Sequence, residues 1–503
     1  DTLWLSTDFG PGSMTSSGYA REVRRWRRGT PYSAAEPVFA GRETDVSVGA
    51  YRELTPGFER DWIFRSETTW TGQAYLYRDG KQIQIDIPDD ADLTTFREWM
   101  FVELRSDWTV GGRTWKQGSL IGMRLEDFLG GSRAFEELFV PTERVSLDSF
   151  VVTRHHLVLR LLDNVRGRLE VLTPGKNGWA RSTIPGLPEL GTIGVSAVDS
   201  EHSDDLFVTT TDFVNPTTLS WVRIGKGQPK PLKRLPAFFD ATGIEITQHD
   251  AISADGTRVP YFEVARRDAP LDGSNRTLLY GYGGFEIPMV PNYSGTIGAS
   301  WLERGGVYVL ANIRGGGEFG PAWHAAALRE NRKKAYEDFA AVAQDLVARK
   351  VTTAAHLGIM GGSNGGLLVG NMLTTYPTLF DAVVCQVPLL DMKRYSHLLA
   401  GASWMGEYGD PDVPEDWAFL QNYSPYQRVK ADVDYPRTLF MTSTRDDRVH
   451  PGHARKMAAR MLEQGHDILY FENVEGGHGA AADNKQAARM WAYAYTFLWK
   501  ELE

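Results

Sequence analysis

The sequence lacks several features that would each point to a particular class of protein. It has a single cysteine, Cys385, in 503 residues, so no disulfide can form within the chain. Because Cys385 lies in an apolar stretch, we expect it to be a small core residue. No run of about 18 apolar residues occurs, so no membrane-spanning helix is expected. Neither an H-E-x-x-H motif nor a cysteine cluster is present, so we expect no metal and no cofactor.

Composition and charge are those of an ordinary globular protein. The formal net charge is −10, with 23% charged and 42% hydrophobic residues. An acidic chain is repelled by phosphate backbones, which argues against a nucleic-acid partner. A length of 503 residues suits two domains.

The most informative feature that is present is a glycine-rich run with one serine inside it. Residues 361–366 read GGSNGG and lie between an apolar stretch, 357–360, and an apolar helical stretch, 367–373. Glycines on both sides of a serine let a strand and a helix approach closely enough to expose the hydroxyl. The pattern predicts a nucleophile elbow with Ser363 at its apex. An ordinary Gly/Ser-rich loop is the alternative.

A histidine and an acid are expected in loops downstream of Ser363. In α/β-hydrolases the partners follow in the order serine, acid, histidine, each after a strand. A second β-type run, 468–474, ends shortly before His478, which has a glycine on each side. We therefore predict that His478 is the general base.

Two neighbouring carboxylates compete for the role of the acid. Asp446 and Asp447 both follow a β-type run, residues 437–442. Asp446 is nearer to the strand end, whereas Asp447 would enter the next helix, where the dipole favours a negative charge. The sequence therefore favours Asp446 as the catalytic acid and keeps Asp447 as the alternative.

The oxyanion of a tetrahedral intermediate needs preorganised donors. The backbone N–H of the residue after the nucleophile, Asn364, is expected to be one of them. The strand 277–280 opens into the glycine-rich loop GYGGF, in which Tyr282 exposes a phenol that could be the second. An aromatic ring packed over glycines is the alternative for Tyr282.

Five separated motifs of the carboxyl-terminal half occur in one order. They are YGYGGF at 280–285, ANIRGGGEF at 311–319, GGSNGG at 361–366, DDRV at 446–449 and GHGA at 477–480. Together they resemble the prolyl oligopeptidase family of serine peptidases, over roughly residues 250–503. The resemblance implies a catalytic triad of Ser363, Asp446 and His478. It also implies an oxyanion hole formed by Tyr282 and the Asn364 amide.

The same resemblance implies a pocket for a proline side chain. Its expected residues are Phe285, Trp404, Tyr408, Arg448 and Val449. Trp404 would stack on the proline ring, and Arg448 would hydrogen-bond a peptide carbonyl. Proline is a flat apolar ring without an N–H, so an aromatic slot can bind it by stacking and burial. An ion pair with one of the two neighbouring aspartates is the alternative for Arg448.

The amino-terminal half shows short β-type runs and few long amphipathic helices. The runs include residues 61–66, 74–77, 149–153 and 206–211, with turn signals such as Asp79-Gly80 between them. This pattern predicts a sandwich or a propeller, and the resemblance implies a seven-bladed propeller. About 230 residues precede the hydrolase half, enough for four or five blades. We therefore expect residues 1–235 to be a partial propeller in a fragment that lacks its first blades.

From about residue 250 strands and helices alternate. A helix over 336–349 has an apolar stripe wide enough to pack on a sheet, and a further helix is expected over 482–500. The run 382–387 is nearly all apolar, as a buried parallel strand should be. We predict that residues 236–503 form a doubly wound, mostly parallel α/β-hydrolase domain.

The hypothesis with most support is a serine-type endopeptidase. It would cleave short peptides on the carboxyl side of proline through an acyl-enzyme, with the propeller restricting substrate size. An esterase or acyl-aminoacyl hydrolase with the same triad is one alternative, and a non-enzymatic interaction protein is another. We expect a monomer in the cytoplasm. A periplasmic or secreted location stays open because the amino terminus is expected to be missing.

Overall fold

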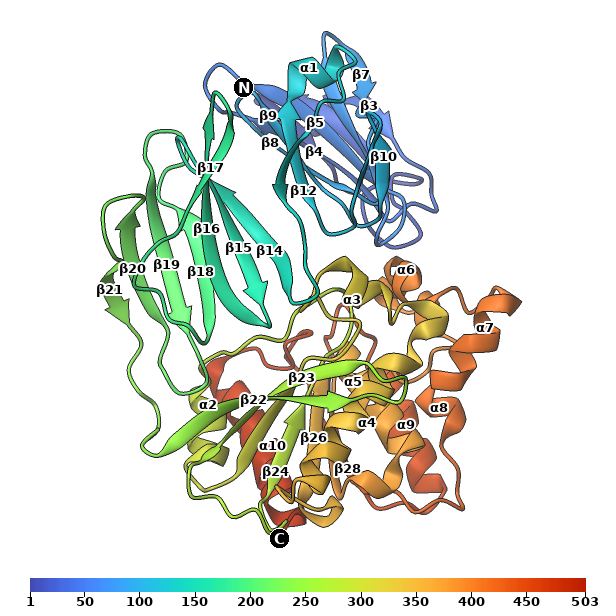
Figure 1. Ribbon diagram of the computed structural model, residues 1–503. Helices are drawn as coiled ribbons and strands as arrows, with labels where there is room; N and C mark the ends of the chain where they lie inside the picture. Colours follow the sequence, from blue (N-terminus) through green and yellow to red (C-terminus); the bar gives the residue numbers. More distant parts are fainter. The chain divides into compact units, whose positions relative to one another are not determined.

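The computed structural model describes residues 1–503, which form two compact units (Figure 1). The first unit contains residues 1–142, 174–180 and 396–409. The second contains residues 143–173, 181–395 and 410–503. The predicted domain boundary near residue 235 remains a prediction, because these units are defined by compactness and not by fold.

The first unit consists mainly of antiparallel sheets. One sheet has the order β1 (Thr2–Leu5), β2 (Glu22–Arg27), β3 (Glu36–Ala40), and the next β4 (Ser47–Glu53), β5 (Arg60–Ser66), β6 (Gly72–Arg78), β7 (Lys81–Gln84). A third has the order β13 (Glu136–Phe139), β12 (Leu120–Arg124), β9 (Trp99–Glu103), β8 (Asp92–Phe96). A hairpin, β10 (Trp108–Val110) with β11 (Arg113–Trp115), and helix α1 (Leu125–Leu129) complete it, together with α6 (Met405–Tyr408). Short meandering strands of this kind are what the sequence pattern predicted.

Alternation of apolar and polar residues explains the packing of this unit. Trp62 on β5, Met100 on β9 and Ile121 on β12 are fully buried in one apolar cluster.

The predicted turn at Asp79-Gly80 joins β6 to β7, and both residues have positive φ, 52° and 74°. Positive φ at both central positions matches the right-handed twist of a two-residue hairpin.

Two further sheets belong mainly to the second unit. One contains β14 (Val145–Val152), β15 (Leu157–Asp163), β16 (Arg166–Gly175) and β17 (Gly178–Ser182), and the other β18 (Thr192–Ala197), β19 (Asp205–Thr211), β20 (Thr218–Arg223) and β21 (Lys230–Arg234). Each runs in sequence order, as the blades of a propeller do. The tip of the β16–β17 hairpin belongs to the first unit, where Trp179 packs against Trp99 with ring centroids 4.9 Å apart.

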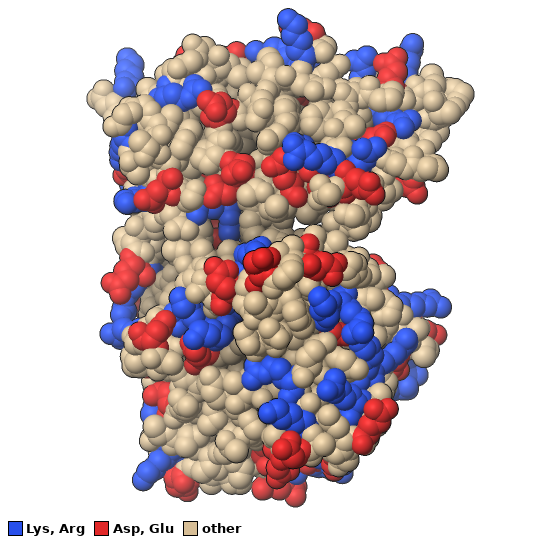
Figure 2. All heavy atoms as spheres, turned by 90° about the vertical axis from the view of Figure 1, so that its right-hand side faces the viewer, with Lys and Arg blue, Asp and Glu red and all other residues tan.

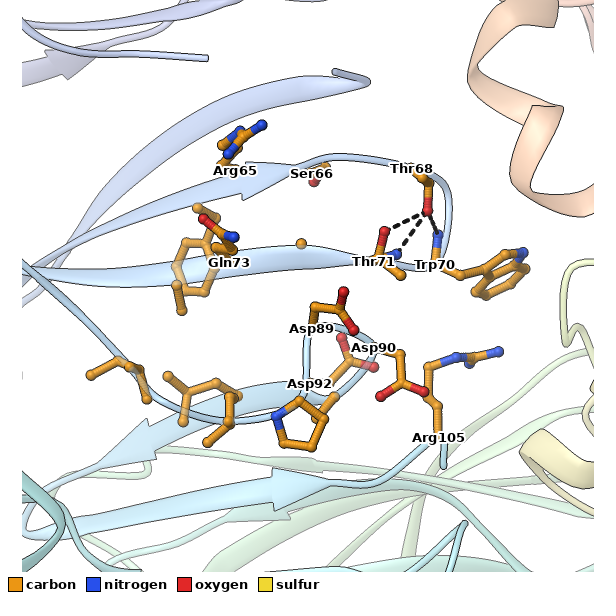
Figure 3. Close-up of a pocket in the computed structure, with 18 of the residues that line it drawn as sticks. Arg65, Ser66, Thr68, Trp70, Thr71, Gln73, Asp89, Asp90, Asp92 and Arg105 are labelled. Atoms are coloured by element: carbon orange, nitrogen blue, oxygen red, sulfur yellow. Dashed lines mark hydrogen bonds between the residues drawn. The ribbon is translucent and has the colours of Figure 1, made fainter. Parts of the chain in front are cut away.

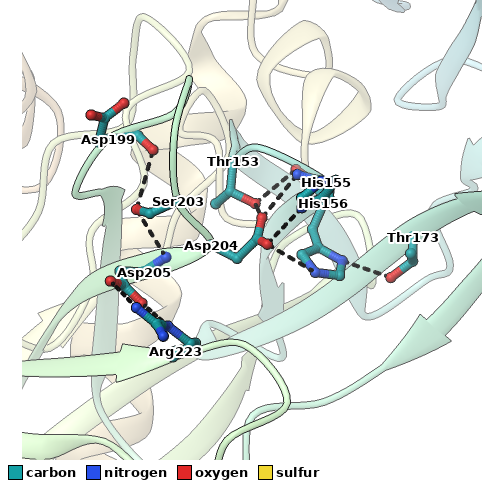
Figure 4. Close-up of polar contacts among 9 residues, drawn as sticks. All are labelled: Thr153, His155, His156, Thr173, Asp199, Ser203, Asp204, Asp205 and Arg223. Atoms are coloured by element: carbon teal, nitrogen blue, oxygen red, sulfur yellow. Dashed lines mark hydrogen bonds and ion pairs between the residues drawn. The ribbon is translucent and has the colours of Figure 1, made fainter.

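A single aspartate links these two sheets (Figure 4). Asp204, just before β19, accepts hydrogen bonds from Thr153 Oγ1 and from the backbone N–H of His155, both at 2.9 Å. Its other carboxylate oxygen lies 2.8 Å from His155 Nδ1. The turn between β14 and β15 is thus fixed to the neighbouring sheet.

The largest sheet has eight strands. Its order is β22 (Ile244–Ile252), β23 (Arg258–Arg266), β25 (Val307–Ala311), β24 (Thr277–Tyr280), β26 (Leu357–Gly362), β27 (Ala382–Gln386), β28 (Arg437–Ser443), β29 (Ile468–Asn473). From β25 to β29 all neighbours are parallel, whereas β22 and β23 are antiparallel additions. The prediction of a mostly parallel sheet is confirmed.

Helices cover both faces of this sheet (Figure 1). Helices α4 (Lys333–Ala348), α5 (Asn364–Thr375) and α9 (Gly452–Glu463) lie on one face, and α10 (Asn484–Glu501) lies on the other. Shorter helices are α2 (Gly295–Ile297), α3 (Pro321–Ala325), α7 (Pro414–Leu420) and α8 (Pro425–Arg428). Strand β26 and helix α10 approach each other closely at Gly358, where an added Cβ would lie 2.8 Å from the Leu498 side chain. The doubly wound arrangement thus follows from strands that are apolar on both faces.

Cys385 lies on β27 and is buried at 1% exposure, with Sγ 3.4 Å from the carbonyl oxygen of Gly366. Burial raises the pKa of this thiol.

On the face shown in Figure 2, acidic and basic side chains are intermixed. No helix has both the length and the apolar character that crossing a bilayer requires.

Candidate active site

The backbone at Ser363 has the conformation of a nucleophile elbow. Ser363 stands between β26 and α5 with φ 59° and ψ −117°, a conformation rarely adopted by a residue with a side chain. A Cβ on Gly361 would lie 2.3 Å from the carbonyl oxygen of Gly365, and one on Gly366 would lie 2.6 Å from the Pro388 Cβ. Strand and helix therefore approach too closely for side chains at these positions, and the predicted strand, turn and helix are confirmed.

The loops carrying the predicted acid and base leave the same edge of the sheet as Ser363. Strands β26, β28 and β29 run parallel, so their carboxyl ends lie on one side. There, His478 Nδ1 is 2.8 Å from Asp446 Oδ2 and 3.0 Å from Oδ1. The two residues, separated by a helix and a strand in sequence, form a hydrogen-bonded pair.

The surroundings of Asp446 distinguish it from its neighbour. Asp446 is 4% exposed, and its Oδ1 accepts the backbone N–H groups of Arg448 at 3.0 Å and Val449 at 2.9 Å. Asp447 is exposed to solvent. A buried carboxylate held by two amides keeps a fixed orientation toward an imidazole, which an exposed one does not.

The structure does not join all three predicted triad residues by hydrogen bonds. The ring of His478 contacts Asp446, and no hydrogen bond connects it to Ser363 Oγ. Catalytic hydrogen bonds are often long without substrate and tighten in the Michaelis complex.

The loop of His478 is held by an amide pair that the sequence did not reveal. Asn473 Nδ2 donates to the Ala480 carbonyl at 2.9 Å and to Gln486 Oε1 at 2.7 Å. The same Gln486 oxygen accepts the N–H of Ala482 at 2.9 Å. These bonds connect the end of β29 to the start of α10, and no local sequence pattern signals them.

A second amide holds the predicted oxyanion loop. Asn364 is 1% exposed, and its Nδ2 donates to the Tyr282 carbonyl at 2.7 Å. Arg332, also 1% exposed, donates to Asn364 Oδ1. Gly284 packs against this pair, since a Cβ there would lie 2.5 Å from Asn364 Nδ2. The sequence does not reveal this contact, because Arg332 lies in the charged run NRKK, which is typical of an exposed helix start.

The predicted pocket residues are divided between the two units. Phe285, with φ 56°, lies in the oxyanion loop, and Val449 is 2% exposed beside Asp446. Arg448 is exposed and forms no ion pair with the neighbouring aspartates, contrary to the alternative considered for it. Trp404 and Tyr408 belong to the first unit, where Tyr408 is fully buried.

A doubly wound sheet, a strained serine elbow and an Asp–His pair on neighbouring strand ends define a serine hydrolase of the α/β type. Comparison with known proteins narrows this class. Residues 292–503 match the model of the prolyl oligopeptidase family. The chain belongs to this family of serine peptidases.

Individual relatives agree with this assignment. The chain is 44% identical over 512 residues to an uncharacterized peptidase, y4nA, of Sinorhizobium fredii, covering 100% of this chain and 70% of the relative. It is 34% identical over 320 residues to a prolyl endopeptidase of Elizabethkingia miricola, covering 63% of this chain and 45% of the relative. A solved structure of a post-proline cleaving enzyme from Rickettsia typhi is similar with a TM-score of 0.94 at 33% identity, covering 100% of this chain and 74% of that one. The predicted fold class, an α/β-hydrolase with a β-propeller, is confirmed.

Proposed function

We propose that this peptidase cleaves short peptides on the carboxyl side of proline through a serine acyl-enzyme. The observation that carries the proposal is the Asp446–His478 pair, 2.8 Å apart, at the sheet edge from which the strained Ser363 also projects. The chain is 33% identical to a solved post-proline cleaving enzyme, and this similarity supports proline-containing peptides as the proposed substrates.

The chemistry follows from the roles of the three side chains. His478 Nε2 takes the proton of Ser363 Oγ–H as Oγ attacks the peptide carbonyl carbon, while Asp446 holds the Nδ1–H tautomer. His478 then gives that proton to the leaving amine, and an acyl-enzyme remains. Water, deprotonated by His478, attacks the ester and releases the acid and Ser363.

Two donors are proposed for the oxyanion formed in each step. They are the backbone N–H of Asn364 and the hydroxyl of Tyr282. The bond from the Asn364 side chain to the Tyr282 carbonyl supports this pairing, because it joins the two segments that would supply the donors.

Specificity for proline would come from Trp404 and the other predicted pocket residues. Val449 would supply apolar surface next to the catalytic acid, since its backbone N–H donates to Asp446 Oδ1 at 2.9 Å. Arg448 supports this role because its guanidinium is exposed and not paired with the adjacent aspartates. A planar donor fork in that position can orient a peptide carbonyl. We further propose that residues 1–235 form the propeller domain and restrict substrate length.

The test is kcat/KM on three matched dipeptide chromogenic substrates with proline, alanine or arginine before the leaving group. It is carried out on the full-length protein and on its Ser363→Ala variant. We expect a strong preference for proline and loss of nearly all turnover in the variant. Turnover of simple esters without proline preference would instead indicate an esterase or acyl-aminoacyl hydrolase. Turnover unaffected by Ser363→Ala would refute the mechanism.

A further inference from the structure

The segment expected to carry the proline slot is attached to the amino-terminal half of the chain. Residues 396–409, which include Trp404 and Tyr408, are the only part of the chain after residue 180 that belongs to the first unit. The segment ends at Gly409, whose φ of 102° and ψ of 166° form a bend suited to glycine. The residues before and after the segment belong to the second unit.

Thr69, in the turn between β5 and β6, contacts this segment on both sides of Trp404. Its Oγ1 donates to the carbonyl oxygen of Ser403 at 2.5 Å, a bond between residues 334 positions apart. On the other side, a Cβ on Gly406 would lie 3.0 Å from Thr69 Oγ1 and 3.1 Å from Thr69 Cβ. Thr69 thus contacts the chain one residue before Trp404 and two residues after it.

The turn that presents Thr69 is fixed by its own hydrogen bonds (Figure 3). Thr68 Oγ1 accepts the N–H of Trp70 at 3.1 Å and that of Thr71 at 3.0 Å, and it lies 2.8 Å from Thr71 Oγ1. The turn borders a cavity of about 300 Å³ within the first unit. These bonds therefore hold Thr69 in a defined position at the edge of the cavity.

We propose that Thr69 is a positioning residue for substrate selection, which sets the backbone position of Trp404 through Ser403 and Gly406. This inference rests on the proposed function, in which Trp404 stacks on proline. Aromatic stacking requires a defined separation and offset, so a small shift of the Trp404 backbone weakens recognition of proline. Alanine, which offers no ring to stack on, should respond less.

The experiment compares four substitutions in the full-length protein. Thr69→Val keeps the shape and removes the hydroxyl, and Thr69→Ser keeps the hydroxyl. Thr109→Val is the matched control, because Thr109 lies in the same unit and its hydroxyl bonds Thr114, and neither the turn nor the segment. A further variant, Gly406→Ala, disturbs the same contact from the opposite side. The measurement is the ratio of kcat/KM for the proline substrate to that for the alanine substrate.

We expect Thr69→Val and Gly406→Ala to lower this ratio by about three- to tenfold, the effect of losing one net hydrogen bond. Thr69→Ser and Thr109→Val should both leave it near the wild-type value. An unchanged ratio in Thr69→Val and Gly406→Ala, or an equal fall in Thr109→Val, would overturn the inference while the proposed function stands. A wild-type enzyme without proline preference would overturn the proposed function and the inference with it.

Discussion

The side-chain amide of Asn364 donates a hydrogen bond to the backbone carbonyl of Tyr282, 2.7 Å away and 82 residues earlier in sequence. It thereby connects the start of α5, directly after the serine elbow, to the glycine-rich loop after β24. In the proposed mechanism both oxyanion donors belong to these two segments, so their spacing depends on this bond.

We expect Asn364→Ala to lower kcat by about ten- to a hundredfold with a smaller change in KM, because oxyanion donors act mainly in the transition state. The measurement is steady-state kinetics on the proline substrate. Asn371→Ala is the matched control. Asn371 lies on the same helix, is fully buried, and donates to the Tyr423 carbonyl at 3.0 Å. Equal losses of kcat in the two variants would show a general structural effect instead.

The two adjacent aspartates should differ sharply in their effect on turnover. Asp446→Asn would present an amide where His478 Nδ1 needs an acceptor, and we expect kcat to fall by about 10³–10⁴-fold. Asp447→Asn, at an exposed position, should retain kcat within about twofold of the wild type. Single-turnover kinetics of both variants, with circular dichroism to verify folding, separates these cases. A larger loss in Asp447→Asn would reverse the assignment of the acid.

Glu318 should make stability depend on pH. Its carboxyl is 1% exposed, and burial raises its pKa to about 8. In the unfolded chain the group ionises near its ordinary pKa of about 4.3, so the unfolded state loses its proton first. Stability from this group is therefore fully present below that value and is lost as pH rises through about 8.

Glu318→Gln removes this titration and keeps an oxygen able to accept from the Met289 N–H, a bond of 2.9 Å. We expect the variant to gain stability relative to the wild type between pH 6 and 9, on the order of a few kcal/mol. Urea unfolding at both pH values measures the difference. A constant difference across that range would contradict a buried protonated Glu318.

Asp204 and Asp205 offer a matched pair for stability. Asp204 links two sheets through several hydrogen bonds, whereas Asp205 pairs with the half-exposed Arg223 (Figure 4). We expect Asp204→Ala to reduce the free energy of unfolding by about 2–4 kcal/mol and Asp205→Ala by less than about 1 kcal/mol. Chemical denaturation measures both values. Similar losses would mean that the link between the sheets adds little stability.

Sequence reasoning located the elements around the site because their signals are local. The helix expected over 336–349 is α4, Lys333–Ala348, and the strand expected over 277–280 is β24. Apolar periodicity and glycine spacing depend on near neighbours in the chain, so both could be read directly. The short strands of the amino-terminal half gave a weaker signal, and the resemblance was needed to distinguish a propeller from a sandwich.

Contacts between distant segments were not predictable in this way. Arg332, Asn364 and Tyr282 meet only because α4, α5 and the loop after β24 converge. The bond from Thr69 to Ser403 depends in the same way on tertiary structure. Polar residues of this kind carry no periodic pattern, and a charged run such as NRKK indicates solvent until the fold buries one of its members.

The burial of Cys385 makes the chain a suitable background for site-directed labelling. A thiol that is 1% exposed and whose pKa is raised reacts slowly with maleimides, which require an accessible thiolate. Cysteines introduced at exposed positions, such as Leu54 in the first unit and Ile252 in the second, could then be coupled to a fluorophore pair without removing a native residue. Energy transfer between the two dyes would measure the distance between these two positions with and without substrate.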